Sequence, residues 1–254
     1  MTLRLDDAPA RGDAAPSLDA TRPATDNPMR HFDFATLPAP DRYRLLTAAV
    51  LPRPIAWAVT RSAEGRVNAA PYSFFNVFGS DRPVVCLGVL ARPDRPKDTA
   101  VNIRATREFV INLVPFALTE AMNLTCVEAP PEVDETRLAG LATLPSVAVR
   151  PPRIADSPVA FECRLIHEFE SGPGQWLFVG EVLHAHVATR VLTGNPERPR
   201  IDHEALDLVA RMHGPSAYLR TRDIFDLVRP VWADIPPQAP PTQPNDSHCK
   251  ERQA

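Results

Sequence analysis

The chain has 254 residues, of which 44% are hydrophobic and 23% charged, and its formal net charge is −3 at pH 7. This balance is typical of a globular protein with a sizeable core, and it excludes a fibrous one. The 28 lysines and arginines are dispersed, which argues against a nucleic-acid partner. No run approaches the ~18 apolar residues of a membrane span, and charged Arg4 and Asp6 stand where a signal peptide needs an apolar core, so we expect a cytoplasmic protein without a membrane partner.

The two ends of the chain differ in composition from its middle. Residues 1–36 and 233–254 are rich in proline and polar residues and poor in aromatic ones. Such segments cannot bury enough apolar surface to offset the entropy that is lost on ordering. We therefore predict a flexible tail over residues 1–36, one domain over residues 37–232 and a disordered tail over residues 233–254.

Two strands are expected early in the domain, around a polar segment. Residues 55–60 and 84–90 are apolar and β-branched, which is typical of sheet strands. Between them, residues 68–76 supply backbone groups, hydroxyls and amides that could line a flat ring. A basic loop that ends in Lys97 follows the second strand.

Helices are expected next in the chain. Asp98 is placed to cap a helix that runs to Glu108, because an Asp side chain accepts hydrogen bonds from first-turn amides. Residues 109–114 form a further predicted strand, and residues 117–128 a second helix that ends before a pair of prolines.

The second half of the domain is predicted to be β. Residues 160–170 and 175–187 are long strand-like runs, and the loop between them, residues 171–174, has the glycines and proline of a hairpin. Successive strands joined in this way close most easily as an antiparallel barrel. The residues therefore predict a mainly β domain with helical insertions.

The four cysteines show no metal or redox spacing. Cys86 and Cys163 lie in apolar runs, which favours buried structural thiols, and Cys249 lies in the C-terminal tail. His184 and His186 would share one strand face, but no third ligand is near, so a pair of half-buried or interface histidines is favoured over a metal site.

Two glutamates also stand in predicted strands. For Glu162 and Glu181 the sequence indicates no partner.

The segment 68–76 has two interpretations from its residues alone. Small Ala69 and Ala70 allow close backbone approach, while Ser73 and Asn76 offer donors and acceptors to a ring. The alternative is an irregular edge strand with its two phenylalanines in the core.

Lys97-Asp98-Thr99 is a candidate phosphate site. It combines a mobile cation, a hydroxyl and the unpaired N–H groups of a helix start. The alternative is a solvated basic loop, and Arg95 is a weaker second phosphate partner.

The segment Pro52 to Trp57 has further alternatives. Pro54 suggests a strand edge, and Trp57 packs either beside a ligand or in the core. Arg53 is a candidate dimer contact or ligand anchor.

Five motifs in this order, PRPIAW, NAAPYSFFN, KDT, EFVINLV and VGEV, resemble those of the flavin reductase-like proteins. The resemblance covers residues 37–232. It implies an FMN-binding split β-barrel, antiparallel and of Greek-key type, with helical insertions, and it implies a homodimer. It also implies that Lys97, Asp98 and Thr99 contact the FMN phosphate.

The resemblance also implies a set of cofactor-binding residues: Ile55, Ala56, Trp57, Ala70, Pro71, Tyr72, Ser73, Phe74, Phe75, Asn76, Lys97, Asp98, Thr99 and His213. At the last of these, similar proteins carry the first glycine of an R-x-G-G-x-x-Y motif, so His213 suggests a changed substrate pocket. We assign no catalytic residue and no metal ligand, because the sequence contains no nucleophile elbow, zinc-protease motif, phosphate-binding loop or dinucleotide fingerprint.

The function that the resemblance implies is an NAD(P)H-dependent flavin reductase. FMN, or alternatively FAD, would accept hydride from NAD(P)H and pass electrons to an acceptor or to a partner monooxygenase. One alternative is a non-enzymatic flavin-binding electron carrier. Another is a heme-binding protein on the same barrel, in which His184, His186 or His213 would be the axial ligand.

Overall fold

The computed structural model describes residues 29–232 in two compact units, one ending at residue 46 and the other starting at residue 47. Helix α1 (Ala39–Ala49) crosses that boundary. Residues 1–28 and 233–254 lie outside the described residues, so the two tails stay a prediction. Among residues 29–232, none of the helices has the length and apolar character needed to cross a membrane.

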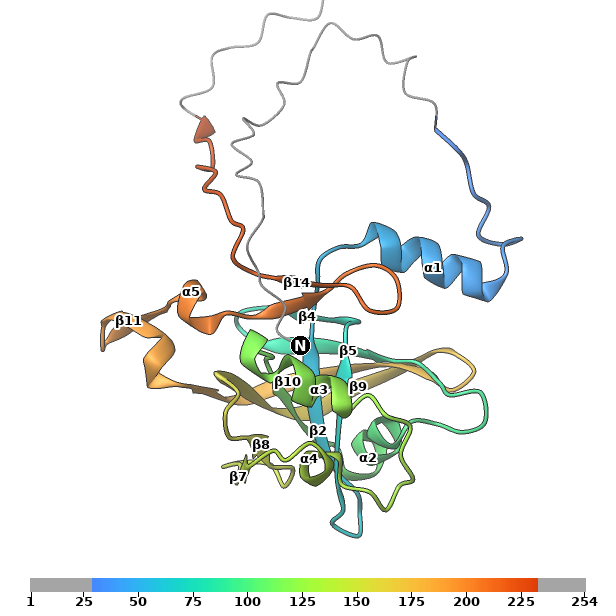
Figure 1. Ribbon diagram of the computed structural model, residues 1–254, viewed down its shortest axis with the longest axis horizontal. Helices are drawn as coiled ribbons and strands as arrows, with labels where there is room; N and C mark the ends of the chain where they lie inside the picture. Colours follow the sequence, from blue (N-terminus) through green and yellow to red (C-terminus); the bar gives the residue numbers. More distant parts are fainter. Residues whose placement is uncertain (1–28, 233–254) are drawn as a thin grey trace, which may run out of the picture. The chain divides into compact units, whose positions relative to one another are not determined.

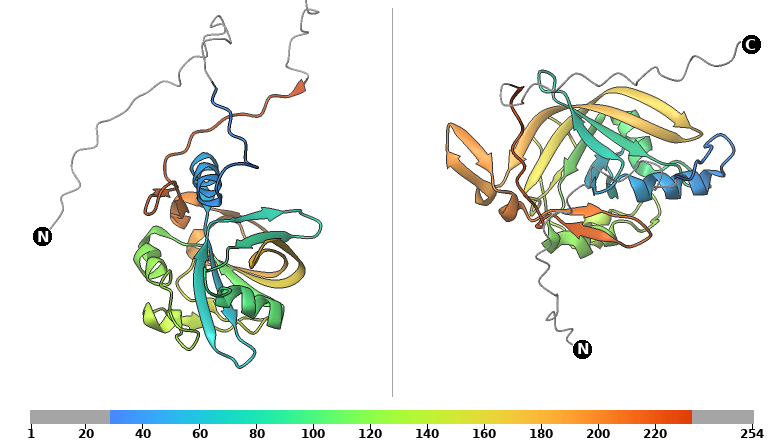
Figure 2. Two further views of the ribbon diagram at one scale, coloured as in Figure 1. Left: turned by 90° about the vertical axis from the view of Figure 1, so that its right-hand side faces the viewer. Right: turned by 90° about the horizontal axis from the view of Figure 1, so that it is seen from above.

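A seven-stranded sheet dominates the second unit, and the strands curl around its interior (Figures 1 and 2). Every ladder among the described residues is antiparallel. The predicted mainly β, antiparallel split barrel is confirmed. In sheet order the strands are β3 (Val67–Tyr72), β2 (Ala56–Arg61), β6 (Glu108–Asn112), β9 (Val159–Gly172), β10 (Gln175–Val187), β5 (Val84–Val89) and β4 (Phe75–Phe78).

Smaller sheets and short helices fill the connections between these strands. The small sheets are formed by β1 (Arg53–Pro54), β13 (Val209–Arg211) and β14 (Tyr218–Arg220), by β7 (Thr143–Leu144) and β8 (Arg153–Ile154), and by β11 (Leu192–Asn195) and β12 (Arg198–Ile201). The helices are α2 (Asp98–Thr106), α3 (Thr119–Leu124), α4 (Glu135–Leu138) and α5 (His203–Leu206).

Strand β2 is buried on both faces and joins two hydrophobic clusters. Ala56 and Ala58 face one cluster, which includes Phe109, while Trp57 and Val59 face the other. This alternation follows from the two-residue repeat of a strand. The first cluster also explains the glycine of the VGEV motif, because a Cβ on Gly180 would stand 2.3 Å from Cζ of Phe109.

The two predicted helices differ from the observed ones at their ends. Helix α2 begins at Asp98, but Lys97 occupies the capping position and no side chain caps the helix, so the predicted Asp98 cap is wrong. The helix ends at Thr106, before the predicted Glu108, because Arg107 adopts a left-handed conformation with φ of 64°.

The predicted helix over residues 117–128 is shorter, comprising a 3₁₀ turn at Phe116–Leu118 and then α3. Thr125 follows α3, and its hydroxyl donates to the carbonyl of Met122 at 2.7 Å. A side chain that bonds to a nearby carbonyl in this way competes with helix continuation.

The cysteine prediction holds for Cys163, which is buried, while Cys86 is only partly buried. Burial raises the pKa of the Cys163 thiol, as expected for a structural cysteine. Cys249 lies outside the described residues.

Glu162 has partners that the sequence did not indicate. Its buried carboxylate accepts hydrogen bonds from the backbone N–H groups of Val147 (2.7 Å) and Ala148 (2.6 Å), and it lies 2.6 Å from Nε2 of His186. Burial opposes ionisation, but these bonds outweigh it and lower the pKa of Glu162. These hydrogen bonds therefore attach the backbone of residues 147–149 to strand β9.

Glu181, the other strand glutamate, also has a partner that the sequence did not indicate. Glu181 forms a two-pronged ion pair with Arg82, each contact being 3.1 Å. Of the two predicted half-buried histidines, His186 is partly buried and His184 is exposed.

Replacing Glu162 by Gln is expected to lower the free energy of unfolding by about 3 kcal/mol at neutral pH, because an amide offers only one accepting atom to several donors. Since the folded-state pKa is lowered, the stability that ionised Glu162 contributes is present above the unfolded pKa and is lost as pH falls through the folded pKa. The free energy of unfolding, measured with urea between neutral pH and about pH 3, should therefore depend less on pH in the variant than in the wild type.

Glu181→Gln is the matched control, because its partner Arg82 is largely exposed and such pairs contribute little. Equal losses of stability for the two variants would contradict the role assigned to Glu162.

Candidate functional site

A small cavity of about 150 Å³ lies where β3 meets the start of α2. We call it the cation cavity, because Arg92 and Lys97 both line it. Its complete lining is Asn68, Ala70, Pro71, Tyr72, Arg92, Lys97, Asp98, Thr99, Thr125, Cys126, Val127, Glu128 and Glu135.

The first turn of α2 forms one wall of the cation cavity. The helix has nine residues, and its first N–H groups have no partner within the helix, so this end carries a partial positive charge. Thr99 is 1% exposed, and its Oγ1 accepts a hydrogen bond from Nδ2 of Asn68 at 3.0 Å. This bond joins the helix start to β3.

The two cations of the cavity lie close to each other and are poorly neutralised. Arg92 is 11% exposed and reaches Asp98 and Glu128 only at 4.0 Å, and its Nε is buried without a hydrogen-bond partner among the described residues. Burial, and then the charge of Arg92, lower the pKa of Lys97. A bound anion would relieve both penalties.

Glu135 is the acidic group buried in this wall. The side chain is 5% exposed, and its Oε2 accepts a hydrogen bond from the backbone N–H of Ala69 at 3.0 Å. Burial raises the pKa of Glu135, and the nearby Asp98 and Asp134 add to this effect. The hydrogen bond to Ala69 joins the start of α4 to β3.

Six of the predicted site residues meet at the cation cavity: Ala70, Pro71, Tyr72, Lys97, Asp98 and Thr99. They come from two segments that are separated by strands β4 and β5 in the sequence. The amino group of Lys97 lies 5.6 Å above the ring of Tyr72. The structure therefore assembles the two motifs that the sequence analysis considered separately.

Phe74, Phe75 and Asn76 line a different space, an apolar groove of about 460 Å³. We call it the aromatic groove. Its other lining residues are Phe78, Cys86, Gly88, Leu90, Ser171, Gln175, Trp176 and Leu177. Phe75 is 9% exposed and belongs to the first core cluster, as the edge-strand alternative expected.

The predicted residues of the PRPIAW motif are buried. Ile55 is 4% exposed, whereas Ala56 and Trp57 are fully buried. The indole Nε1 of Trp57 donates to Oγ1 of Thr125 at 2.9 Å. Of the two placements considered for Trp57, the structure shows the core, so this side chain supports the cation cavity from behind.

The guanidinium groups of Arg53 and Arg95 donate hydrogen bonds to backbone carbonyls of the chain. Arg53 is 7% exposed; it donates to the carbonyls of Thr47, Val50 (3.1 Å) and Met212 (3.0 Å) and to Oγ of Ser73 (3.3 Å). These contacts give Arg53 an internal role, and its roles as ligand anchor or dimer contact stay predictions. Arg95 donates to the carbonyl of Ala129 at 3.0 Å and does not line the cation cavity, so the geometry favours Lys97 and Arg92 over Arg95 as phosphate partners.

His213 lies in the exposed loop between β13 and β14 and lines neither of these two spaces. Arg211 holds the loop by donating to the carbonyls of Gly214 and Ala217, both at 2.6 Å. Burial raises the pKa of the Cys126 thiol, which lines the cation cavity, and the charges of Lys97 and Arg211 partly offset this effect.

Sequence reasoning missed Glu135, Thr125 and Cys126 as parts of the site. A local signal exists for Glu135, because Asp134 caps α4 by accepting from the N–H groups of Thr136 and Arg137. An Asp followed by helix-forming residues is a start signal for a helix. No comparable signal marks Thr125 or Cys126.

Comparison with protein families gives one match that spans most of the domain. The model of the flavin reductase like domain matches residues 48–200. An uncharacterized protein from Deinococcus radiodurans is 41% identical over 208 residues, which cover 80% of this chain and 91% of that protein.

Solved structures are similar over the same region. Nitrilotriacetate monooxygenase component B from Bacillus cereus has a TM-score of 0.73 and 29% identity, and the match covers 79% of this chain and 100% of that one. The 2-nitrobenzoate 2-nitroreductase NbaA from Pseudomonas fluorescens also has a TM-score of 0.73, with 30% identity and coverage of 83% and 100%.

The cation cavity is expected to bind inorganic phosphate, and Lys97→Met should weaken that binding about tenfold, because a charge-assisted hydrogen bond is lost. Isothermal titration of the full chain with phosphate measures the change. Arg95→Met is the matched control, since Arg95 belongs to the same loop but bonds to Ala129. Equal weakening in both variants would indicate a diffuse effect of loop charge rather than a site.

Proposed function

We propose, on the premise that the chain belongs to the flavin reductase-like family, that it is an FMN-binding, NAD(P)H-dependent flavin reductase. The family membership and the similar solved proteins support a flavin-related oxidoreductase. The nicotinamide cofactor, the choice of FMN over FAD and the acceptor are the parts that we propose.

The observation that carries this proposal is the cation cavity. Two partly buried cations, a helix start and the buried hydroxyl of Thr99 converge there, and Nε of Arg92 has no hydrogen-bond partner among the described residues. This donor set suits the phosphate of FMN. A volume of about 150 Å³ admits a phosphate and its neighbouring carbons but not three fused rings, so the ring would lie outside the cavity.

In this proposal, Lys97 and Arg92 balance the phosphate charge, and the first-turn N–H groups of α2 and Thr99 position its oxygens. Ala70, Pro71 and Tyr72 form the adjoining wall, and Phe74 to Asn76 line the aromatic groove further along the chain. Ser73, between them, lines neither space and accepts a hydrogen bond from Arg53 at 3.3 Å. The role of the buried motif residues would be indirect: they pack behind this wall and hold it in place. These residues are Ile55, Ala56 and Trp57. A bound flavin would itself supply the acceptance of hydride from NAD(P)H. The protein then needs no acid or base of its own.

A homodimer is part of the proposal. Strand β4 lies at one edge of the seven-stranded sheet, where Val77 is 61% and Phe78 53% exposed. Exposed apolar edge strands are normally covered, and a second copy of the chain would cover this one.

We also propose transfer of electrons to a partner monooxygenase or another acceptor. The similar Bacillus cereus protein is described as a component of a monooxygenase, which supports a partner of that class.

The purified protein is expected to bind FMN, and NADH or NADPH should bleach the flavin absorption. Lys97→Met and Thr99→Val should weaken FMN binding about tenfold or more, because each removes a polar contact to the phosphate. Fluorescence titration measures the affinity and stopped-flow absorption the hydride transfer. A protein that fails to bind FMN, or variants with unchanged affinity, would refute the proposal.

The same experiment tests the two alternatives. An electron carrier would bind FMN without rapid reduction by NAD(P)H. A heme protein would give a Soret band that is lost on changing a histidine, although His186 is already engaged with Glu162 at 2.6 Å.

His213→Gly restores the glycine that the family motif carries at this position. If the His213 loop borders the nicotinamide site, this change should alter the KM for NAD(P)H several-fold while FMN affinity stays the same, because the loop does not line the cation cavity. Steady-state kinetics measures the effect. His203→Gly, in the short helix α5, is the control for loss of a surface histidine. An unchanged KM would remove His213 from the site.

A further inference from the structure

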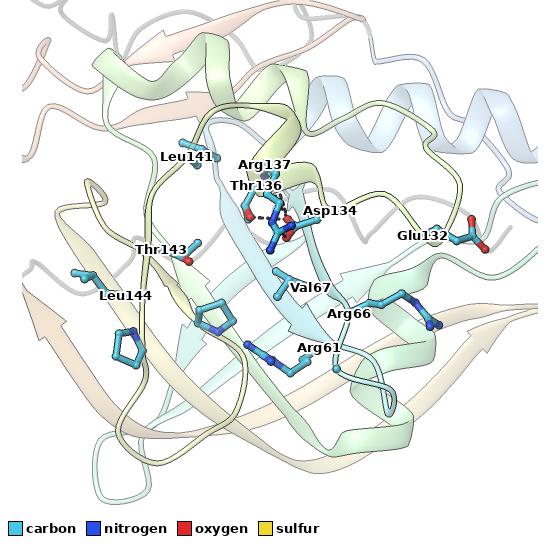
Figure 3. A pocket seen from close by; sticks show the side chains of 13 residues that line it. Arg61, Arg66, Val67, Glu132, Asp134, Thr136, Arg137, Leu141, Thr143 and Leu144 are labelled. Atoms are coloured by element: carbon cyan, nitrogen blue, oxygen red, sulfur yellow. Dashed lines mark hydrogen bonds and ion pairs between the residues drawn. The ribbon is translucent and has the colours of Figure 1, made fainter.

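A larger cavity of about 680 Å³ shares no lining residue with the cation cavity or the aromatic groove (Figure 3). We call it the Arg61 cavity. It is lined by Arg61, Gly65, Arg66, Val67, Glu132, Asp134, Thr136, Arg137, Leu141, Thr143, Leu144, Pro145 and Pro152. Its volume falls within the ~300–1,000 Å³ of typical small-molecule sites.

Paired strands and a capped helix fix the walls of the Arg61 cavity. Arg61 ends β2 and stands opposite Val67 in β3, and Thr143 and Leu144 belong to the β7–β8 pair. Asp134 and Thr136 stand at the start of α4, where Asp134 is the cap. Regular structure forms part of the cavity wall, and connecting segments that carry Gly65, Glu132, Leu141, Pro145 and Pro152 form the rest.

Strand β3 separates the Arg61 cavity from the cation cavity. Successive side chains of a strand point to opposite faces. Val67 lines the Arg61 cavity, while the next residue, Asn68, lines the cation cavity. The two spaces are thus neighbours that can be occupied independently.

Most charges around the Arg61 cavity are already paired. Arg66 bonds to Glu64 at 3.0 Å, and Arg137 lies 3.5 Å from Asp134, whose carboxylate also accepts from the first turn of α4. Figure 3 shows Arg66 and Glu132 on the side of the cavity away from Thr143 and Leu144.

Arg61 is the lining cation without an ion pair among the described residues, and Glu132, on the side away from Thr143 and Leu144, is the lining carboxylate without one. Within residues 29–232 the Arg61 guanidinium forms no ion pair, and its Nε is buried without a hydrogen-bond partner. Figure 3 shows the side chain extending from the end of β2 toward the Thr143 and Leu144 side. A partly buried guanidinium in this state is incompletely satisfied, and its planar fork matches a carboxylate.

Apolar side chains lie in the same cavity. Val67, Leu141, Leu144, Pro145 and Pro152 line it together with Thr143 and with Arg61, whose charge is unpaired among the described residues. One positive charge matches a monoanion, whereas a phosphate dianion would need further donors. Apolar walls contribute to affinity only for a ligand that has an apolar body.

We propose that the Arg61 cavity is a binding site for a small organic monocarboxylate with a compact apolar body. The carboxylate pairs with the Arg61 guanidinium, and the body packs against Val67, Leu141 and Leu144. This site is separate from the proposed flavin site.

The proposal is tested by titrating the full chain with benzoate and measuring binding by calorimetry or ligand-observed NMR. Benzoate is expected to bind, and benzamide, which has the same ring without the charge, should bind at least about tenfold more weakly. Arg61→Met should produce a similar loss, because it keeps the aliphatic stem and removes the guanidinium. Arg66→Met is the control, since Arg66 is already paired with Glu64, and it should leave benzoate affinity unchanged.

A second variant guards against misfolding as an explanation. Leu144 is 40% exposed, so Leu144→Trp should fold normally, as circular dichroism would verify, yet its indole should fill the cavity and block benzoate. The proposal is overturned if benzoate fails to bind the wild type, if Arg61→Met and Leu144→Trp bind it as the wild type does, or if inorganic phosphate displaces it at equal concentration. A separate titration of the same samples with FMN tests the proposed flavin site and not the Arg61 cavity. Benzoate binding without FMN binding would refute the flavin proposal alone.

Discussion

The buried hydrogen bond between Asn68 and Thr99 is the contact on which the cation cavity depends. It joins β3 to the first turn of α2 across 31 positions of the chain. Both side chains are shielded from water, where an unpaired partner would cost about 1–3 kcal/mol. A second bond of the same kind, from Asn102 Nδ2 to Thr60 Oγ1 at 3.0 Å, joins α2 to β2. Two amide–hydroxyl pairs therefore hold the positive end of the helix against the sheet.

This rigid attachment gives the cation cavity its electrostatic character. Lys97 occupies the capping position of α2, so its charge adds to that of the helix end, and Arg92 approaches from the preceding loop. Burial, and then the like charge of Arg92, lower the pKa of Lys97. The positive charges of the cation cavity therefore favour the binding of an anion. Strand β3, with its alternating faces, separates the cation cavity from the Arg61 cavity.

Local motifs predicted the strands and the start of α2 well, because each depends on neighbouring residues. The hairpin of β9 and β10 follows from alternating apolar residues around a glycine-proline loop, and α2 begins at Asp98, one residue before the start that the predicted Asp98 cap implied. The partners of Glu162 could not be predicted, because the amide donors lie in an irregular segment some fifteen positions away. The same limit applies to Thr125, which meets Trp57 across 68 positions.

The sequence by itself determined the family, the mainly β class and the KDT turn, since these rest on ordered motifs and on the repeat of strands. Only the tertiary structure decided that Lys97 and Tyr72 face one cavity while Phe74 and Phe75 line another, and that Trp57 is core. It alone revealed that Arg61 lacks an ionic partner within the described residues. The physical reason is that burial and charge pairing depend on contacts between distant strands, and the pairing order of the sheet cannot be read from any one segment.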